Sequence, residues 1–178
     1  GPLTMLIGKW VGDRGMDIAP EPEGVEKSPY FETITFEAAG DVTNAEQQVL
    51  AVVRYHQVVS RKSNGKVFHD QVGYWMWDAA TDVVMHSLVI PRAVALVAEG
   101  VAVEQDGEVT LSVKTADSAG VNSIAESAFM SGKARTTGFV LEMKVGREHH
   151  SYNETTMLDI YNKKAFEHTD RNKLVRLA

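Results

Sequence analysis

Segments in which apolar and polar residues alternate follow one another along most of the chain after its first dozen residues. In 30–37, Phe31, Thr33 and Thr35 fall on one face, while Ile34 and Phe36 fall on the other. An alternation with a period of two is typical of a half-buried β-strand. Further strands are predicted at 48–60, 67–77, 83–90, 93–98, 100–104, 108–115, 135–145 and 150–161.

Turn signals between these segments indicate how the strands connect. Ser63-Asn64-Gly65-Lys66 and Asp106-Gly107 are typical of tight hairpins. Many short strands joined in this way predict an all-β fold, either an antiparallel sandwich or a barrel. The absence of long helical patterns between the strands argues against a parallel α/β sheet. We favour an up-and-down barrel of about ten strands, whose interior has room for one small molecule.

Three segments depart from the strand pattern. Residues 3–7 predict a short helical plug at one end of the barrel. Residues 17–29 hold three of the five prolines and are predicted to form an extended loop. Residues 117–132 are rich in Ser and Ala and predict a loop or short helix over the barrel mouth. No internal repeat or linker interrupts the 178 residues, so a single domain over 1–178 is expected.

Composition narrows the classes of function. A formal net charge of -6 argues against nucleic acid as the main partner, because phosphate binding needs a clustered basic surface. With no cysteine, the chain cannot form disulfides, zinc–thiolate sites or iron–sulfur clusters, which suits a reducing cytoplasm. No apolar run is long enough to span a bilayer, so neither a membrane partner nor a secretory signal is expected. Whether edge strands pair into a homodimer stays open.

Two histidines are the candidate cofactor ligands. His69 begins an aromatic-rich strand and shares its face with Gln71, Gly73 and Trp75. If that face points inward, His69 can hydrogen-bond a bound ligand, and Gly73 leaves room for a flat molecule. If it points outward, His69 is an ordinary rim residue. His168 lies near the C-terminus, where it is either a ligand or a partly buried histidine satisfied by a carbonyl or by a neighbouring carboxylate.

An imidazole that reaches into an apolar, aromatic-lined pocket is the usual way in which a protein holds haem iron. A different use of the same cavity is as a non-haem carrier of a small apolar or amphipathic molecule. Arg135, Tyr152 and Glu154 could place polar groups inside the barrel for such a ligand. A third reading is a cavity filled by side chains, in a protein that acts through its surface.

Four segments, taken in order, resemble the nitrobindin-like haem-binding β-barrels, which have a domain like that of fatty-acid-binding proteins. Leu3-Thr4-Met5-Leu6-Ile7-Gly8-Lys9-Trp10-Val11-Gly12 is similar to the family's opening Gly-x-Trp-x-Gly-x-Gly run. The other three are Phe68-His69-Asp70-Gln71-Val72-Gly73-Tyr74-Trp75, the segment from Ser87 to Gly100, and His168-Thr169-Asp170-Arg171-Asn172-Lys173-Leu174. The resemblance covers nearly the whole chain and places it in this family or in a sister branch.

The resemblance implies a ten-stranded barrel that holds ferric haem b through one histidine. It also implies reactivity with nitric oxide and, as in some members, isomerisation of peroxynitrite to nitrate. His168 would be the proximal ligand and the metal-binding residue, and His69 would lie on the distal side or at the pocket edge. Trp10 would pack at the barrel base, and Gly73 and Trp75 would belong to the haem pocket.

The sequence departs from the family's pattern at three places. After Gly12 the chain reads Asp13-Arg14-Gly15, so the second glycine of the opening run is replaced. The loops at 20–27 and 117–133 are longer than the family implies. Both loops are expected to reshape the pocket mouth.

Overall fold

The computed structural model describes residues 1–116 and 121–177. Strands make up most of it, with one 3-10 helix at the start and one short α-helix before the last three strands. The elements in chain order are η1 (Pro2–Leu6), β1 (Gly8–Glu21), β2 (Gly24–Asn44), β3 (Gln48–Arg61), β4 (Val67–Asp78), β5 (Val83–Ile90), β6 (Val94–Gln105), β7 (Glu108–Lys114), β8 (Ile124–Glu126), α1 (Ala128–Lys133), β9 (Ala134–Val145), β10 (His149–Ile160) and β11 (Lys163–Arg176).

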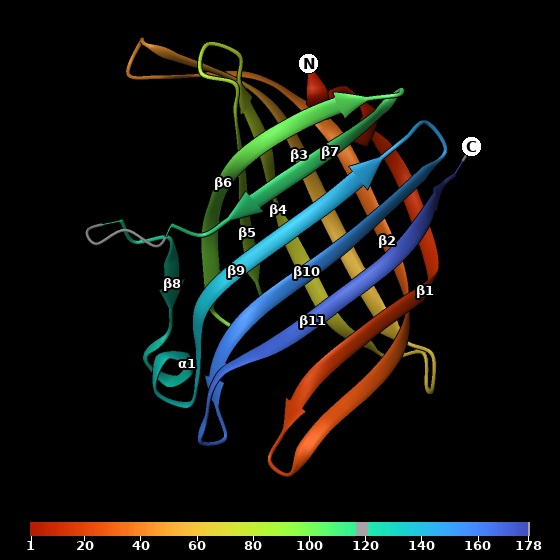
Figure 1. The fold of residues 1–178 in the computed structure, drawn as a ribbon, viewed down its shortest axis with the longest axis vertical. Helices are drawn as coiled ribbons and strands as arrows, with labels where there is room; N and C mark the ends of the chain where they lie inside the picture. Colours follow the sequence, from red (N-terminus) through yellow and green to blue (C-terminus); the bar gives the residue numbers. More distant parts are fainter. Residues whose placement is uncertain (117–120, 178) are drawn as a thin grey trace.

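Within the described residues, ten antiparallel strands close into a barrel (Figure 1). The order is β5-β4-β3-β2-β1-β11-β10-β9-β7-β6, and a pairing between β5 and β6 closes the ring. The short strand β8 pairs with residues Val94 to Leu96 of β6 and lies outside the ring. The predicted all-β barrel of about ten strands is therefore confirmed. No helix in the described part of the chain is long and apolar enough to cross a membrane.

The alternation of apolar and polar residues along the strands arises because one face of each strand points into the barrel and the other faces solvent. On β2, Ile34 and Phe36 are buried inside the barrel, whereas Phe31 on the opposite face is 49% exposed. Apolar side chains fill the end of the barrel near η1, where Leu6, Trp10 and Trp75 are almost fully buried. The N-terminal segment is a short 3-10 helix, so the expected helical plug is not confirmed.

A β-bulge in β1 changes which residues of that strand face the interior. Between Gly12 and Met16, β1 contains one residue more than β2 and β11 beside it. Because side chains alternate with a period of two, one extra residue exchanges the two faces of the strand. Trp10 is buried before the bulge and Asp17 after it. Gly15 lies in the bulge, where a Cβ would come within 2.0 Å of the Tyr30 ring.

Three predicted segment boundaries need correction. Residues 17–29 form no loop but the hairpin of β1 and β2, whose turn lies between Glu21 and Gly24. The chain does not stop forming strands after Tyr161, because β11 follows and contains His168. The segment 121–133 contains the short helix α1, which agrees with the predicted loop or short helix, and also the strand β8, which was not predicted. Residues 117–120, the start of that predicted segment, lie outside the described residues.

Candidate functional site

The barrel encloses a cavity of about 280 Å³ at the end opposite η1, near α1 and the β10–β11 hairpin (Figure 1). Its volume is at the lower end of the range for ligand pockets, which is about 300–1,000 Å³. Both histidines singled out in the sequence, His69 and His168, line this cavity from different walls. Arg61 and Arg92 also line it. The apolar wall is made by Val59, Phe68, Leu88, Ile90, Val94, Leu96, Phe139, Leu158 and Ile160.

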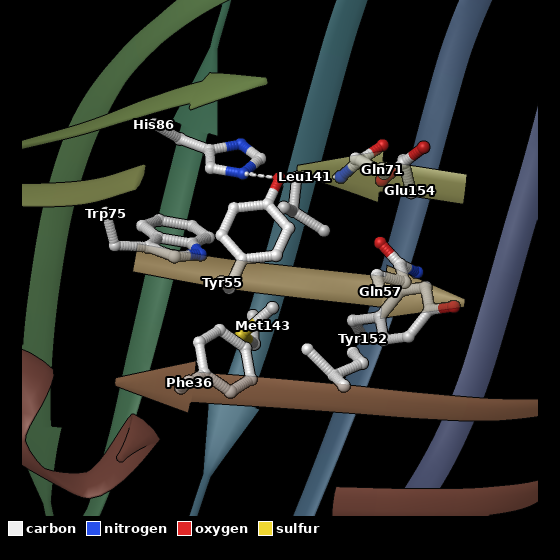
Figure 2. A pocket seen from close by; sticks show the side chains of 11 residues that line it. Phe36, Tyr55, Gln57, Gln71, Trp75, His86, Leu141, Met143, Tyr152 and Glu154 are labelled. Atoms are coloured by element: carbon white, nitrogen blue, oxygen red, sulfur yellow. Dashed lines mark hydrogen bonds between the residues drawn. The ribbon is translucent and has the colours of Figure 1, made fainter. Parts of the chain in front are cut away.

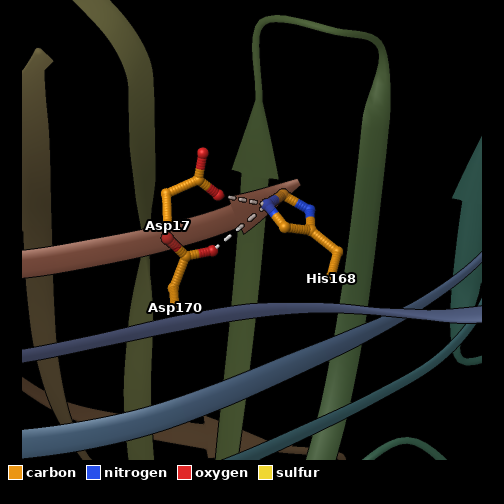
Figure 3. Close-up of side chains that lie close together, drawn as sticks. All are labelled: Asp17, His168 and Asp170. Carbon is orange, nitrogen blue, oxygen red and sulfur yellow. Dashed lines mark hydrogen bonds and ion pairs between the residues drawn. The ribbon is translucent and has the colours of Figure 1, made fainter. Parts of the chain in front are cut away.

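His168 makes contact with two carboxylates through one ring nitrogen (Figure 3). Its Nε2 lies 2.6 Å from Asp17 Oδ1 and 3.5 Å from Asp170 Oδ2. Asp17 is brought to this position by the bulge of β1, which pairs it with Asp170 across the strands. Burial opposes protonation of His168, but the hydrogen bond to Asp17 and the charges of Asp170 and Asp17 outweigh it and raise the pKa of the imidazole.

Two glutamates, the buried Glu32 and the half-buried Glu154, extend this acidic wall. Glu154 is the cross-strand partner of Asp170 and lines the cavity. Burial and the charge of Glu32 raise the pKa of Glu154 to about 8. Burial also raises the pKa of Glu32 to about 7, although Asn172, Tyr152 and a glutamine donate hydrogen bonds to its carboxylate. The wall therefore holds carboxyl groups that keep their protons near neutral pH.

His69 belongs to a chain of hydrogen bonds that runs from the cavity into the core. Figure 2 shows the inner members of this chain, Gln71, Tyr55 and His86. His69 Nε2 lies 3.2 Å from Gln71 Oε1, and Gln71 Nε2 donates to the Tyr55 hydroxyl at 2.6 Å. Tyr55 in turn lies 2.8 Å from His86 Nε2, and His86 stacks on Trp75. Because an amide oxygen only accepts, His69 donates from Nε2 and is neutral when its other nitrogen is bare. Burial lowers the pKa of His69, which favours that neutral form.

The other predicted pocket residues lie away from the cavity. Trp10 is buried in the core near η1, where its indole donates to the Leu6 carbonyl at 2.7 Å. Trp75 lines a separate hollow of about 20 Å³, deeper in the barrel and large enough for one water (Figure 2). At Gly73, the space that a side chain would use is filled by the Ser87 carbonyl and the Tyr55 ring. The structure therefore brings His69 and His168 together but not these three residues.

Sequence reasoning did not single out Asp17 or Arg92, and it gave Glu154 another role. Asp17 was assigned to a loop, and only the bulge turns it inward. The pairing of β1 with β11 joins residues 151 positions apart, which no local pattern indicates. Of the three polar residues considered for a carrier, Tyr152 and Glu154 do face the interior, whereas Arg135 is exposed outside.

The lining residues match the chemical parts of a haem. The imidazole of His168 supplies a nitrogen donor, and its Nε2 already has the carboxylate partner that orients and strengthens a histidine ligand. The apolar wall suits a porphyrin face. Arg61 and Arg92 supply cations for carboxylate substituents such as propionates. The donor set of this cavity therefore fits the cofactor.

Comparisons with known proteins agree with this chemistry. The family model of the THAP4-like, heme-binding beta-barrel domain matches residues 1–176. The crystal structure of Rv2717c from M. tuberculosis superposes with a TM-score of 0.73 at 19% sequence identity, over 99% of this chain and 95% of that one. A search of curated proteins finds no match. The structural likeness shows a shared fold, and the family model confirms the resemblance found in the sequence: the chain belongs to the THAP4-like family of haem-binding β-barrel domains.

Proposed function

We propose that this barrel binds haem b in its cavity, with His168 as the axial ligand. The observation that supports the proposal is the position of the His168 ring, which lines an apolar cavity and has a carboxylate hydrogen bond on one nitrogen. Ligand histidines commonly need such a partner, because it orients the ring and raises its basicity. The family to which the chain belongs is consistent with this cofactor.

The residues around His168 have separate roles in this proposal. Asp17 orients the imidazole, while Arg61 and Arg92 bind the carboxylate groups of the ligand near the mouth. His69, neutral and held by Gln71, adds a polar group to an otherwise apolar wall. Bound haem would supply a ferric iron able to bind nitric oxide or to convert peroxynitrite into nitrate. The cavity walls would limit the access of water to the iron.

Hemin titration tests the cofactor proposal. We expect the purified protein to give a stoichiometric shift of the Soret band, and we expect His168→Ala to lose it because the nitrogen donor is gone. His56→Ala is the matched control, since His56 is exposed on the outer face and pairs with Asp70. A free-hemin spectrum in both the wild type and His168→Ala would contradict haem ligation and favour the non-haem carrier.

A second measurement tests the reaction. With the reconstituted protein, we expect peroxynitrite to decay faster than in buffer and to yield nitrate, and we expect His168→Ala to lose the acceleration. Nitric oxide binding without faster peroxynitrite decay would instead mark a sensor or carrier of nitric oxide.

A further inference from the structure

The two carboxylates and the imidazole beside the cavity converge on a single point (Figure 3). Asp17 lies on β1, and His168 and Asp170 lie on the same inward face of β11. One donor atom from each residue lies within 4.8 Å of the other two. Side chains on two paired strands therefore hold three metal-ligating atoms in one place, without a loop.

The charges on this wall are arranged in an unusual way. Asp17 pairs across the strands with Asp170, and Asp170 pairs with Glu154 on the next strand. Like charges directly opposite one another destabilise a sheet, so a row of three carboxyl groups needs protons or a cation. His168 is the one side chain of basic type that contacts the row in the described part of the chain.

Neither of the arginines that line the cavity contacts this row of carboxyl groups within the described residues. Arg61 forms an ion pair with Glu26 at 2.7 Å and also donates to Ser28. Arg92 donates to the Phe68 carbonyl at 3.0 Å. Glu154 points into the cavity and forms no hydrogen bond or ion pair with any other described residue. Its side-chain carboxyl group can therefore face an ion bound beside it without first breaking another contact.

One imidazole and two carboxylates, with positions left for water, suit a particular class of ion. First-row divalent ions such as Zn²⁺, Mn²⁺ and Fe²⁺ accept this mixed nitrogen and oxygen set. Ca²⁺ and Mg²⁺ bind through oxygen alone and suit it less. The ion would replace the hydrogen bond between His168 and Asp17 and would neutralise the row that includes Glu154.

We propose that the haem-free barrel binds one divalent transition-metal ion through Asp17, His168 and Asp170, with Glu154 as a neighbouring carboxylate that compensates its charge. The site goes beyond the haem proposal and does not depend on it. Its ligands are two carboxylates that would not be ligands of haem iron, together with the one imidazole that both sites would share.

Calorimetric titration of the chelator-treated full chain with Zn²⁺ tests the site. We expect one ion per chain, and we expect Asp17→Asn and Asp170→Asn each to weaken binding about tenfold or more, since even the loss of an outer-shell partner of a metal ligand costs that much. Co²⁺ should give absorption bands in the wild type that both variants lose. Asp70→Asn is the matched control, because Asp70 pairs with the exposed His56 on the outer surface.

Other outcomes separate this proposal from the haem proposal. Zn²⁺ binding that survives both site variants, or that is lost in Asp70→Asn, would overturn the metal site, as would a wild type that binds no ion. If Asp17→Asn does not fold, Asp170→Asn provides the same test, because the Asp170 side chain is less buried. Arg92→Ala should weaken hemin binding and leave Zn²⁺ binding intact, so the two proposals can fail independently.

Discussion

At the scale of single residues, the apolar core of the barrel contains the ionisable side chains of His86 and His150. His86 and His150 are both about 1% exposed, and neither ring can gain a proton without a large desolvation cost. Both nitrogens of His150 lack a hydrogen-bond partner within the described residues. The ring lies instead against Trp10 and Phe36, as a core aromatic residue would. Because these histidines are buried in their neutral form, we expect the stability of the packed end of the barrel to fall in acid.

We predict that His150 destabilises the protein in acid. Burial lowers the pKa of His150 to about 3, whereas the unfolded chain keeps a value near 6.5. Above pH 6.5 the ring is neutral in both states. Between that pH and about 3 only the unfolded state binds the proton. The free energy of unfolding therefore falls by about 1.4 kcal/mol for each unit by which the pH is lowered.

The variant His150→Phe should remove this slope in urea unfolding measured between pH 4 and pH 6 (about 1.4 kcal/mol per pH unit less than the wild type). The adjacent His149 is exposed and pairs with Glu108, so His149→Phe serves as the control. An unchanged slope in His150→Phe would show that the buried ring does not cause the acid sensitivity.

At the scale of elements, β1 shows how a bulge can place a polar group inside a barrel. The strand buries Trp10 near η1 and Asp17 in the cavity, although these residues are seven positions apart and would otherwise face opposite sides. The Tyr30 ring packs directly against Gly15, and its hydroxyl lies 2.7 Å from that of Tyr152. The bulge and the tyrosine pair therefore stabilise one another.

We predict that Gly15→Ala weakens the barrel by about 1–3 kcal/mol, the usual cost of forcing extra atoms into a packed interior. The new Cβ would meet the Tyr30 ring at 2.0 Å and push it from Tyr152. Urea unfolding monitored by tyrosine and tryptophan fluorescence measures the loss. Gly132→Ala is the control, because a Cβ there meets no atom within 4 Å and the residue lies in α1. Equal stability of both variants would contradict the packing argument.

The elements also show which parts of the fold the sequence could reveal. Strands that bury apolar residues, such as β2 around Ile34 and Phe36, have a clear alternation and were predicted. The hairpin of β1 and β2 and the strand β11 were missed because their inward side chains at the cavity are polar, as with Asp17, His168 and Asp170. A strand whose inner face lines a polar cavity loses the periodicity that identifies it. His168 was singled out although its strand was missed, whereas Asp17 escaped prediction for the same reason as the strand that carries it.

At the scale of the whole molecule, the barrel is packed at one end and hollow at the other. The core residues Trp10, Phe36, Trp75 and Val145 lie on the side of η1, while the cavity lies near α1 and the turns between β1 and β2 and between β10 and β11. Stability within a protein follows local burial, and regions with few apolar contacts open more easily. We therefore expect a ligand to enter the cavity through the less stable half of the barrel.

We predict that backbone amides exchange their hydrogens more slowly at the packed end of the barrel than at the hollow end. Amides of β3 and β9 near Val53, Leu141 and Met143 should exchange slowest, because their side chains belong to the core. Amides beside the β1–β2 turn and the β10–β11 turn should exchange much faster, and bound hemin should slow them. Mass spectrometry of peptides from the two ends measures this difference. Uniform protection along each strand would contradict the division.

The bulge in β1 also means that the way the strand pairs, as much as the identity of its residues, sets the chemistry of the cavity. A point substitution at Asp17 removes one carboxylate. A strand of the same length that paired regularly, without the bulge, would instead turn Met16 and Ile18 inward and Asp17 outward, while changing no side chain. Related barrels that keep this length but pair without the bulge would present an apolar wall to the same volume, and so would select different ligands within one fold.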